Sequence, residues 1–297
     1  MSDGAILGID VGGTKIAAGV VDPATGAILA RETIATGPAR GGAAILDDTV
    51  ALARRLIAAS ARPVARIGIG VPQLVDVAGR IRSAYNFDWM NLPVRSRLAE
   101  LAPTTIESDV RAAALGEASF GAGTGYRQFV YVTIGTGLSY CLVLDGKPYA
   151  GANGFAIHFA SSALHVICAS CGAVNRPVLE EIAAGPAIAA TYARRTGRAT
   201  SSAEAVVAAA AAGDPTAVAV IGEAADRLGP LIGLIVNMLD PAAIVLGGGL
   251  GLAPGLYRDR LVASTRAHIW AESCRDLPIL PAALRADAGV IGAALLR

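Results

Sequence analysis

The sequence predicts an α/β protein of two lobes, and three observations support this prediction. The chain has 297 residues, which is enough for one large or two medium domains. Short apolar strand patterns alternate with helical patterns, as is typical of a sheet covered by helices. A strand, a glycine turn and a second strand occur near the N-terminus and again after residue 128. We therefore expect two similar halves, with no low-complexity linker between them.

The first half begins with two apolar runs, residues 5–11 and 16–21, joined by residues 12–15. This pattern predicts a β-hairpin with glycines at its tip. Residues 43–60 carry apolar side chains at helical spacing, and residues 67–72 predict a buried strand that ends at a proline. A helix followed by a strand indicates a parallel arrangement in this part of the sheet.

The next unit of the first half is a strand that leads into a helix. Residues 105–109 precede an alanine-rich helical pattern over residues 110–120. Ser108 and Asp109 are both candidates for the helix N-cap, because short polar side chains accept hydrogen bonds from the first free N–H groups of a helix. Asp109 is therefore expected at a corner between strand and helix.

The second half repeats the combination of strands and helices. Residues 129–144 predict two strands around a glycine turn, and helical patterns follow over residues 180–213. A longer helix is expected over residues 217–239, with a kink at its Gly-Pro pair. A strand over residues 242–246 and a final helix over residues 288–296 complete the pattern.

Composition narrows the class of protein. Apolar residues make up 54% of the chain, and the 25 basic residues nearly balance the 24 acidic ones without forming a stripe, so we expect no nucleic acid as partner. The most apolar stretch, residues 228–250, contains Asn, Asp, Pro and three consecutive glycines, which favours a buried helix and strand over a membrane span. We find no signal peptide pattern, and we expect a cytoplasmic protein whose four cysteines form no structural disulfides.

The first glycine turn carries the first chemical signal. Asp10 ends an apolar run, and Gly-Gly-Thr-Lys follows at residues 12–15. Backbone N–H groups, a hydroxyl and a carboxylate in one turn are suited to holding phosphate and orienting Mg²⁺. The alternative is an ordinary glycine hairpin with a surface lysine.

Two further glycine turns, at residues 135–137 and 247–249, also follow apolar strands. Glycine at such positions lets the backbone approach a nucleotide closely. With Asp109 between the first two turns, the sequence resembles the ROK family of sugar kinases, within the actin-like and hexokinase-like ATPase superfamily. The resemblance extends from residue 8 to residue 294.

The resemblance implies a fold and a division of labour. It implies two ribonuclease-H-like lobes around a central cleft, with an N-terminal lobe over residues 1–118, completed by the C-terminal helix 285–297, and a C-terminal lobe over residues 119–284. It places the first two glycine turns at the ATP phosphates and the third beside adenosine. It also implies Asp109 as catalytic base and a homodimer.

Several positions depart from the family's pattern. The family's Glu-Asn-Asp reads Glu-Ser-Asp here, with Ser108 in place of the amide, and Gln73 stands where the family has glycine. The family's Glu-x-Gly-His reads His158 to Ser161, while Glu180 matches its second sugar-binding glutamate. These changes predict altered substrate specificity beside an intact base.

The family's zinc motif is also incomplete. His165, Cys168 and Cys171 provide three of the four ligands that a structural zinc site needs, so we expect no structural zinc. The alternative for the cysteines is that they are reduced and buried as small apolar residues.

We therefore expect an ATP- and Mg²⁺-dependent kinase for a hydroxyl of a sugar or polyol other than plain glucose, such as an amino sugar, sugar acid or cyclitol. The alternative is an inactive sensor for sugar or nucleotide. A related transcriptional repressor is not expected, because nine residues precede Asp10. The candidate site residues are Asp109 as base; Asp10, Gly12, Gly13, Thr14, Lys15, Gly135, Thr136 and Gly137 for phosphate and Mg²⁺; Gly247, Gly248 and Gly249 for adenosine; and Gln73, Ser108, Asp109, His158, Ser161 and Glu180 for substrate.

Overall fold

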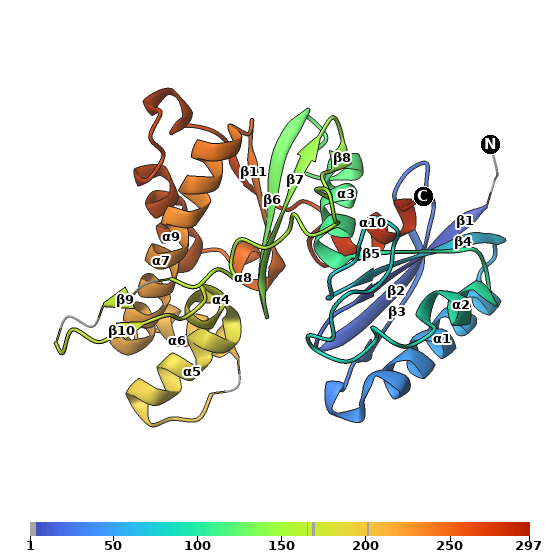
Figure 1. The fold of residues 1–297 in the computed structure, drawn as a ribbon, viewed down its shortest axis with the longest axis horizontal. Coiled ribbons are helices and arrows are strands. Elements are labelled where there is room, and N and C mark those ends of the chain that lie inside the picture. The colour runs from blue at the N-terminus through green and yellow to red at the C-terminus, as the bar shows by residue number, and fades with distance from the viewer. Residues whose placement is uncertain (1–3, 165, 168–169, 201) are drawn as a thin grey trace. The chain divides into compact units, whose positions relative to one another are not determined.

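A computed structural model describes residues 4–164, 166–167, 170–200 and 202–297 (Figure 1). The chain divides into two compact units. Unit 1 comprises the residues up to Gln128 together with Cys141–Ile157 and Ala282–Arg297, and unit 2 comprises Phe129–Tyr140 and His158–Pro281. The chain thus leaves unit 1 twice and returns to it with its C-terminal helix.

Unit 1 contains a five-stranded sheet of mixed direction with the order β3-β2-β1-β4-β5. Its strands are β1 (Ala5–Val11), β2 (Lys15–Val21), β3 (Ile28–Ala35), β4 (Val64–Val71) and β5 (Thr104–Ser108). The first three strands pair antiparallel, whereas β4 runs parallel to both β1 and β5. The carboxyl ends of β1, β4 and β5 therefore lie at one edge of the sheet.

Helices cover both faces of this sheet, because its strands are apolar on both sides. Leu7 and Ile9 of β1 pack in a core with Ile45 and Leu52 of α1 (Gly42–Ala59). The neighbouring residue Ile6 faces the opposite way and packs with residues of α10 (Ala288–Leu295). Figure 1 shows α1 and α2 (Val94–Ala99) on one face of the sheet and α10 on the other.

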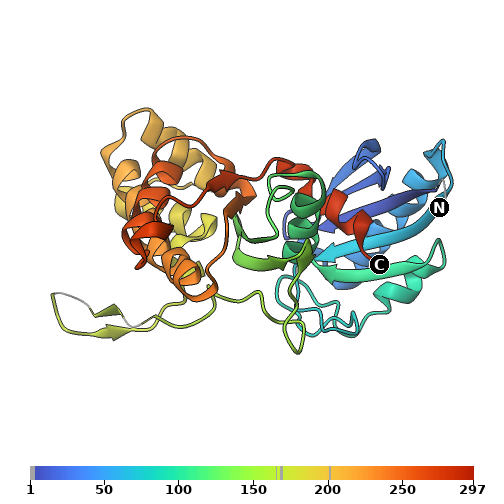
Figure 2. The same ribbon diagram turned by 90° about the horizontal axis from the view of Figure 1, so that it is seen from above.

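The packing of α10 against its neighbours depends on glycines. A Cβ atom added to Gly8 of β1 would lie 2.0 Å from the carbonyl oxygen of Val290, and one added to Gly68 of β4 would lie 1.7 Å from that of Ala293. A Cβ on Gly292 of α10 would lie 1.7 Å from the carbonyl oxygen of Ala112 in α3 (Asp109–Phe120). Figure 2 shows α10 beside α3. Backbone meets backbone here, and no side chain fits between.

A buried carboxylate fixes the chain just before α10. Glu117 of α3 is fully buried and accepts hydrogen bonds from the N–H groups of Ala122, Ala283 and Leu284 at 2.7, 3.0 and 2.8 Å. These bonds to a charged acceptor compensate for its burial. They anchor the returning C-terminal segment on α3.

The second sheet has the order β12-β11-β6-β7-β8. Its strands are β6 (Gln128–Ile134), β7 (Leu138–Leu144), β8 (Lys147–Pro148), β11 (Ile244–Gly247) and β12 (Ile279–Pro281). Strand β11 runs parallel to both β6 and β12. A separate two-stranded sheet pairs β9 (Val166–Ile167) with β10 (Val174–Asn175).

The helices of unit 2 centre on the long helix α7 (Pro215–Leu239), which packs against α9 (Leu256–Ala267). The others are α4 (Glu180–Ala183), α5 (Gly185–Thr196), α6 (Ala203–Ala211) and α8 (Gly248–Leu252). Three short 3-10 helices, Pro38–Arg40, Glu272–Cys274 and Arg285–Asp287, complete the described elements. Within the described residues, no single helix is long and apolar enough to cross a membrane, although α6 and α7 pass that test as a pair bent by 120°.

Most predicted elements are confirmed, and the differences have local causes. Strand β3 was not predicted, because its alternating exposed and half-buried residues give a weak apolar signal. Helix α7 begins at Pro215, where the Asp214 carboxylate accepts hydrogen bonds from the N–H groups of Thr216 and Ala217, and it runs on past Pro230. Ser108 stands at the N-cap position of α3, but its side chain makes no capping hydrogen bond, whereas Asp109 Oδ1 accepts from the free N–H group of Val110 in the first turn.

The glycine packing predicts that a glycine-to-alanine substitution in α10 destabilises the protein, the opposite of its usual effect in a helix. Replacing Gly292 with alanine normally favours a helix, but here the new methyl group would meet the Ala112 carbonyl group. We expect Gly292→Ala to lower the free energy of unfolding by about 3 kcal/mol in urea titrations. Gly125→Ala is the matched control, since that position opens onto empty space, and equal losses in both variants would contradict the packing argument.

Candidate active site

The first glycine turn joins β1 to β2 at the edge of the unit 1 sheet. The N–H group of Gly12 donates to the carbonyl oxygen of Lys15 at 2.8 Å, which closes the turn. Thr14 and Lys15 are exposed, as expected for groups that receive a ligand from solvent. The predicted glycine hairpin is therefore confirmed, and the Thr14 and Lys15 side chains lie at its surface.

Asp10 lies in β1 next to this turn. Burial raises the pKa of its carboxyl group to about 6, although the nearby Lys15 ammonium lowers it. Asp10 is nevertheless half-buried, so part of the residue remains accessible to solvent. Gly289 in the first turn of α10 makes room for the carboxylate, since a Cβ there would lie 2.4 Å from Asp10 Oδ2.

Asp109 is the first residue of α3 and lies close to Asp10. In the sheet register Gly70 of β4 is opposite Asp10, and a Cβ on Gly70 would lie 3.3 Å from the Asp109 Cα atom. Desolvation and the Asp10 carboxylate raise the pKa of Asp109 to about 7, while the hydrogen bond from the Val110 N–H group (2.6 Å) and the Arg111 charge lower it. The two aspartates thus form a pair whose negative charge calls for a cation or a transferable proton.

Two of the predicted substrate residues keep buried polar atoms without partners. The Gln73 Nε2 atom donates to the carbonyl oxygen of Phe87 at 3.0 Å, which fixes the amide, while its Oε1 atom finds no partner among the described residues. The fully buried Ser108 Oγ atom likewise finds none there. Buried polar groups in native proteins are normally paired, so both atoms have unused hydrogen-bonding capacity.

Arg111, which the sequence did not single out, supports the same corner of unit 1. The residue is 1% exposed, and its guanidinium pairs with the Glu107 carboxylate and donates to the carbonyl oxygens of Val75 (2.9 Å) and Gly154. It therefore ties together the end of β5, the segment after β4 and the Gly-rich turn at residues 151–154. A basic residue two positions after a candidate catalytic aspartate was the available signal.

In unit 2, the second glycine turn lies between β6 and β7. The Gly135 N–H group donates to the carbonyl oxygen of Gly137 at 3.0 Å, and the Gly185 N–H group at the start of α5 donates to the carbonyl oxygen of Gly135 at 2.8 Å. The Glu180 Oε2 atom accepts from the Leu138 N–H group at 2.9 Å. Thr136 remains exposed at the tip.

The third glycine turn follows β11 and opens α8 beside the second. Gly248 has φ +77° and lies against the backbone of Ile134, so any side chain there is excluded. A Cβ on Gly135 would lie 3.7 Å from the Gly249 nitrogen atom, which brings the two turns together. The backbones of the second and third glycine turns therefore lie next to each other in unit 2.

Three predicted substrate residues also gather in unit 2. The Ser161 Oγ and His158 Nδ1 atoms are 3.3 Å apart, and the Glu180 charge acts on His158. Partial desolvation lowers the pKa of His158, although the Glu180 charge raises it, and the net effect favours the neutral imidazole. A neutral ring next to a hydroxyl offers both a donor and an acceptor.

The zinc motif is only partly covered by the described residues. His165 and Cys168 lie outside them, and Cys171 is exposed with a free thiol. Over the described ranges there is no group of three or more metal-ligating side chains. The expectation that no structural zinc is bound therefore stays a prediction.

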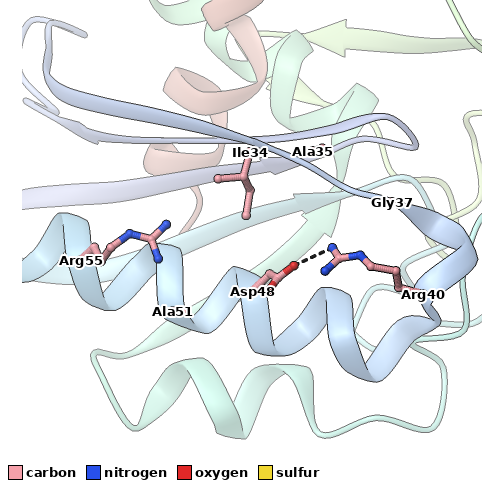
Figure 3. Close-up of a pocket in the computed structure, with 7 residues that line it drawn as sticks. All are labelled: Ile34, Ala35, Gly37, Arg40, Asp48, Ala51 and Arg55. Atoms are coloured by element: carbon pink, nitrogen blue, oxygen red, sulfur yellow. Dashed lines mark hydrogen bonds and ion pairs between the residues drawn. The ribbon is translucent and has the colours of Figure 1, made fainter.

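A surface pocket of about 350 Å³ lies apart from these residues, between β3 and α1 of unit 1 (Figure 3). Its polar lining consists of Arg40, Asp48 and Arg55, and each arginine is already paired with an acid. None of the predicted site residues lines it.

Comparison with known proteins assigns the family. The sequence model of the ROK family matches residues 6–297. The chain belongs to the ROK family. It is 31% identical over 312 residues to a glucokinase of Streptomyces coelicolor, covering 98% of this chain and 96% of the relative. It is likewise 31% identical over 306 residues to an N-acetylgalactosamine kinase of Shewanella, covering 97% and 95%.

A solved structure agrees in fold. The ROK family glucokinase from Streptomyces griseus, determined with glucose and AMPPNP, superposes with a TM-score of 0.84 at 30% identity and 98% coverage of both chains. The predicted fold class, an α/β protein of the actin-like ATPase type, is thereby confirmed for this ROK protein.

The buried Arg111 pair yields a stability prediction. Arg111→Met leaves the Glu107 carboxylate and two carbonyl oxygens without their donor, so we expect the free energy of unfolding to fall by about 3 kcal/mol. Arg97→Met is the control, because Arg97 pairs with Asp47 at the exposed surface and such pairs contribute little. Similar urea midpoints for Arg111→Met and wild type would refute the bridging role.

Proposed function

We propose that this ROK protein is a carbohydrate kinase that transfers the γ-phosphoryl group of ATP to a hydroxyl of a sugar or sugar-like polyol. Family membership and relatives named as sugar kinases support the reaction class. The observation that carries the proposal is the pair Asp10 and Asp109, two desolvated carboxylates beside the first glycine turn. A protein that only binds sugar has no need of such a costly pair.

Asp109 is proposed as the general base. The substrate hydroxyl oxygen forms a bond to the γ-phosphorus atom while the bond from that phosphorus to the ADP oxygen breaks, and the hydroxyl proton passes to the Asp109 carboxylate. A pKa of about 7 suits this step, since about half of the carboxylate is ionised at neutral pH and it can still hold the proton it receives.

Asp10 and the first turn are proposed to hold Mg²⁺ and phosphate. The Asp10 carboxylate is a hard oxygen donor, and desolvation outweighs the lowering of its pKa by Lys15, so a bound cation fits its charge. When bound, Mg²⁺ neutralises charge on the phosphate oxygens. Residues 12–15 and 135–137 are the proposed phosphate contacts, and residues 247–249 the proposed adenosine contact.

The substrate is proposed to differ from plain glucose. Gln73 and Ser108 bring a fixed amide oxygen and a hydroxyl, and His158, Ser161 and Glu180 bring a neutral ring, a hydroxyl and a carboxylate. An amide oxygen and a neutral imidazole favour substituents that donate and accept hydrogen bonds, such as those of amino sugars or cyclitols. The predicted homodimer stays a prediction.

The direct test is ADP release from Mg·ATP across hexoses, amino sugars, sugar acids and inositols. We expect at least one substrate class to stimulate release, and Asp109→Asn to lower kcat by a factor of about 10² to 10⁴. Asp47→Asn, a change at an exposed aspartate of α1, is the matched control. Ligand-induced thermal shifts without any turnover in the wild type would instead identify the protein as a sensor.

The pH dependence follows from the raised pKa of Asp109. The proposed base must be ionised, and its proton is bound below a pH of about 7 in the free protein. We therefore expect kcat/KM for the sugar to be level above pH 8 and to fall about tenfold per pH unit below 6. A profile that stays flat down to pH 5 would rule out a base with this pKa.

A further inference from the structure

Thr36 contacts the first glycine turn from a neighbouring strand. It follows the last residue of β3, where Ala35 is paired with Lys15, so Thr36 stands opposite Thr14. Its side chain is fully buried. The Thr36 Oγ1 atom donates to the carbonyl oxygen of Gly12 at 2.7 Å, and its N–H group donates to that of Thr14 at 3.0 Å. One residue thus holds two carbonyl groups of the turn.

Holding a carbonyl group also directs the N–H group of the following residue. The peptide unit is planar and trans, so the Gly13 N–H group points opposite to the Gly12 carbonyl group. A Gly-Gly peptide is the part of the chain that rotates most freely, because neither residue has a Cβ. The Thr36 hydroxyl therefore selects one orientation of the Gly12–Gly13 peptide unit from several that the sequence permits.

We propose that Thr36 is a positioning residue that aims the backbone N–H groups of the first glycine turn at the phosphates of the nucleotide. This inference rests on the proposed function, and it adds a residue that has no direct contact with the reacting atoms. Its effect falls on the nucleotide, because the bonds of Thr36 run to residues 12–14.

Arg40 fixes Thr36 in turn. Its Nη2 atom donates to the carbonyl oxygen of Thr36 at 2.9 Å and to Asp48 Oδ2 of α1 at 2.6 Å. Figure 3 shows the Arg40 and Asp48 side chains reaching toward one another at the rim of the surface pocket. The chain beyond β3 is thereby tied to α1, and Thr36 is held on both sides.

The structure offers a matched set of variants. Thr36→Val keeps the shape of the side chain and removes the hydroxyl, whereas Thr36→Ser keeps the hydroxyl. Thr49→Val is the control, because Thr49 is equally buried and its hydroxyl donates to the carbonyl oxygen of Ile45 at 2.7 Å within α1, away from the turn. Thr36→Ala provides the same deletion if the valine variant does not fold.

The measurement is the Kd for Mg·ADP by titration calorimetry. Loss of one buried hydrogen bond predicts a Kd about five- to tenfold higher for Thr36→Val, a Kd within about twofold of wild type for Thr36→Ser, and no change for Thr49→Val. In the same variants, amide exchange at residues 12–15 should accelerate for Thr36→Val alone. An unchanged Kd in Thr36→Val, or an equal increase in Thr49→Val, would overturn the positioning role.

The two proposals fail in different ways. If the wild type binds Mg·ADP but turns over no sugar, the kinase proposal fails, and a weaker Kd in Thr36→Val still supports the positioning role. If sugar turnover is normal and Thr36→Val matches the wild type in Kd and in exchange, the positioning role alone is refuted. A wild-type protein that does not bind Mg·ADP refutes both.

Discussion

The close contact of α10 with β1, β4 and α3 is the constraint on which the site of unit 1 depends. Three glycines remove the side chains that would otherwise separate these backbones, and Glu117 holds the returning segment by accepting hydrogen bonds from the N–H groups of Ala283 and Leu284. Gly289 of the same helix leaves space for the Asp10 carboxylate. The C-terminal helix therefore belongs to the architecture of the N-terminal hairpin, although it is the last element of the chain.

This packing brings the carboxylates of Asp10 and Asp109 to the same edge of the sheet. Asp10 and Asp109 both flank Gly70, where the strand is thin enough for the backbone of α3 to approach. Desolvation raises the pKa of both carboxyl groups, and the Asp10 charge raises that of Asp109 further. A pair of this kind is poor for stability but suited to holding a cation and accepting a proton, as phosphoryl transfer requires.

The sequence predicted the glycine turns and the position of Asp109, but it did not predict the residues that hold them in place. The glycine turns, the Asp109 corner and the α/β class follow from local patterns, because turns and strand ends have their own residue signatures. Thr36 acts through contacts with a segment distant in the chain that nothing in its local sequence marks. Arg111 also reaches distant segments, and its one local signal was its place two positions after Asp109. The predicted cap at Ser108 is absent because the side chain is buried without a local partner, a departure that only the packing of β5 and α3 decides.

The central claim is that Asp10 and Asp109 act on one another as desolvated neighbours. The most direct measurement is the titration of ¹³C-labelled aspartate carboxyl groups by NMR in the nucleotide-free protein, compared between wild type and Asp10→Asn. The account predicts that Asp109 titrates near pH 7 in the wild type and at a lower pH once the Asp10 charge is removed. A carboxyl group at position 109 that titrates near the ordinary aspartate value of 3.8 in both proteins would contradict it.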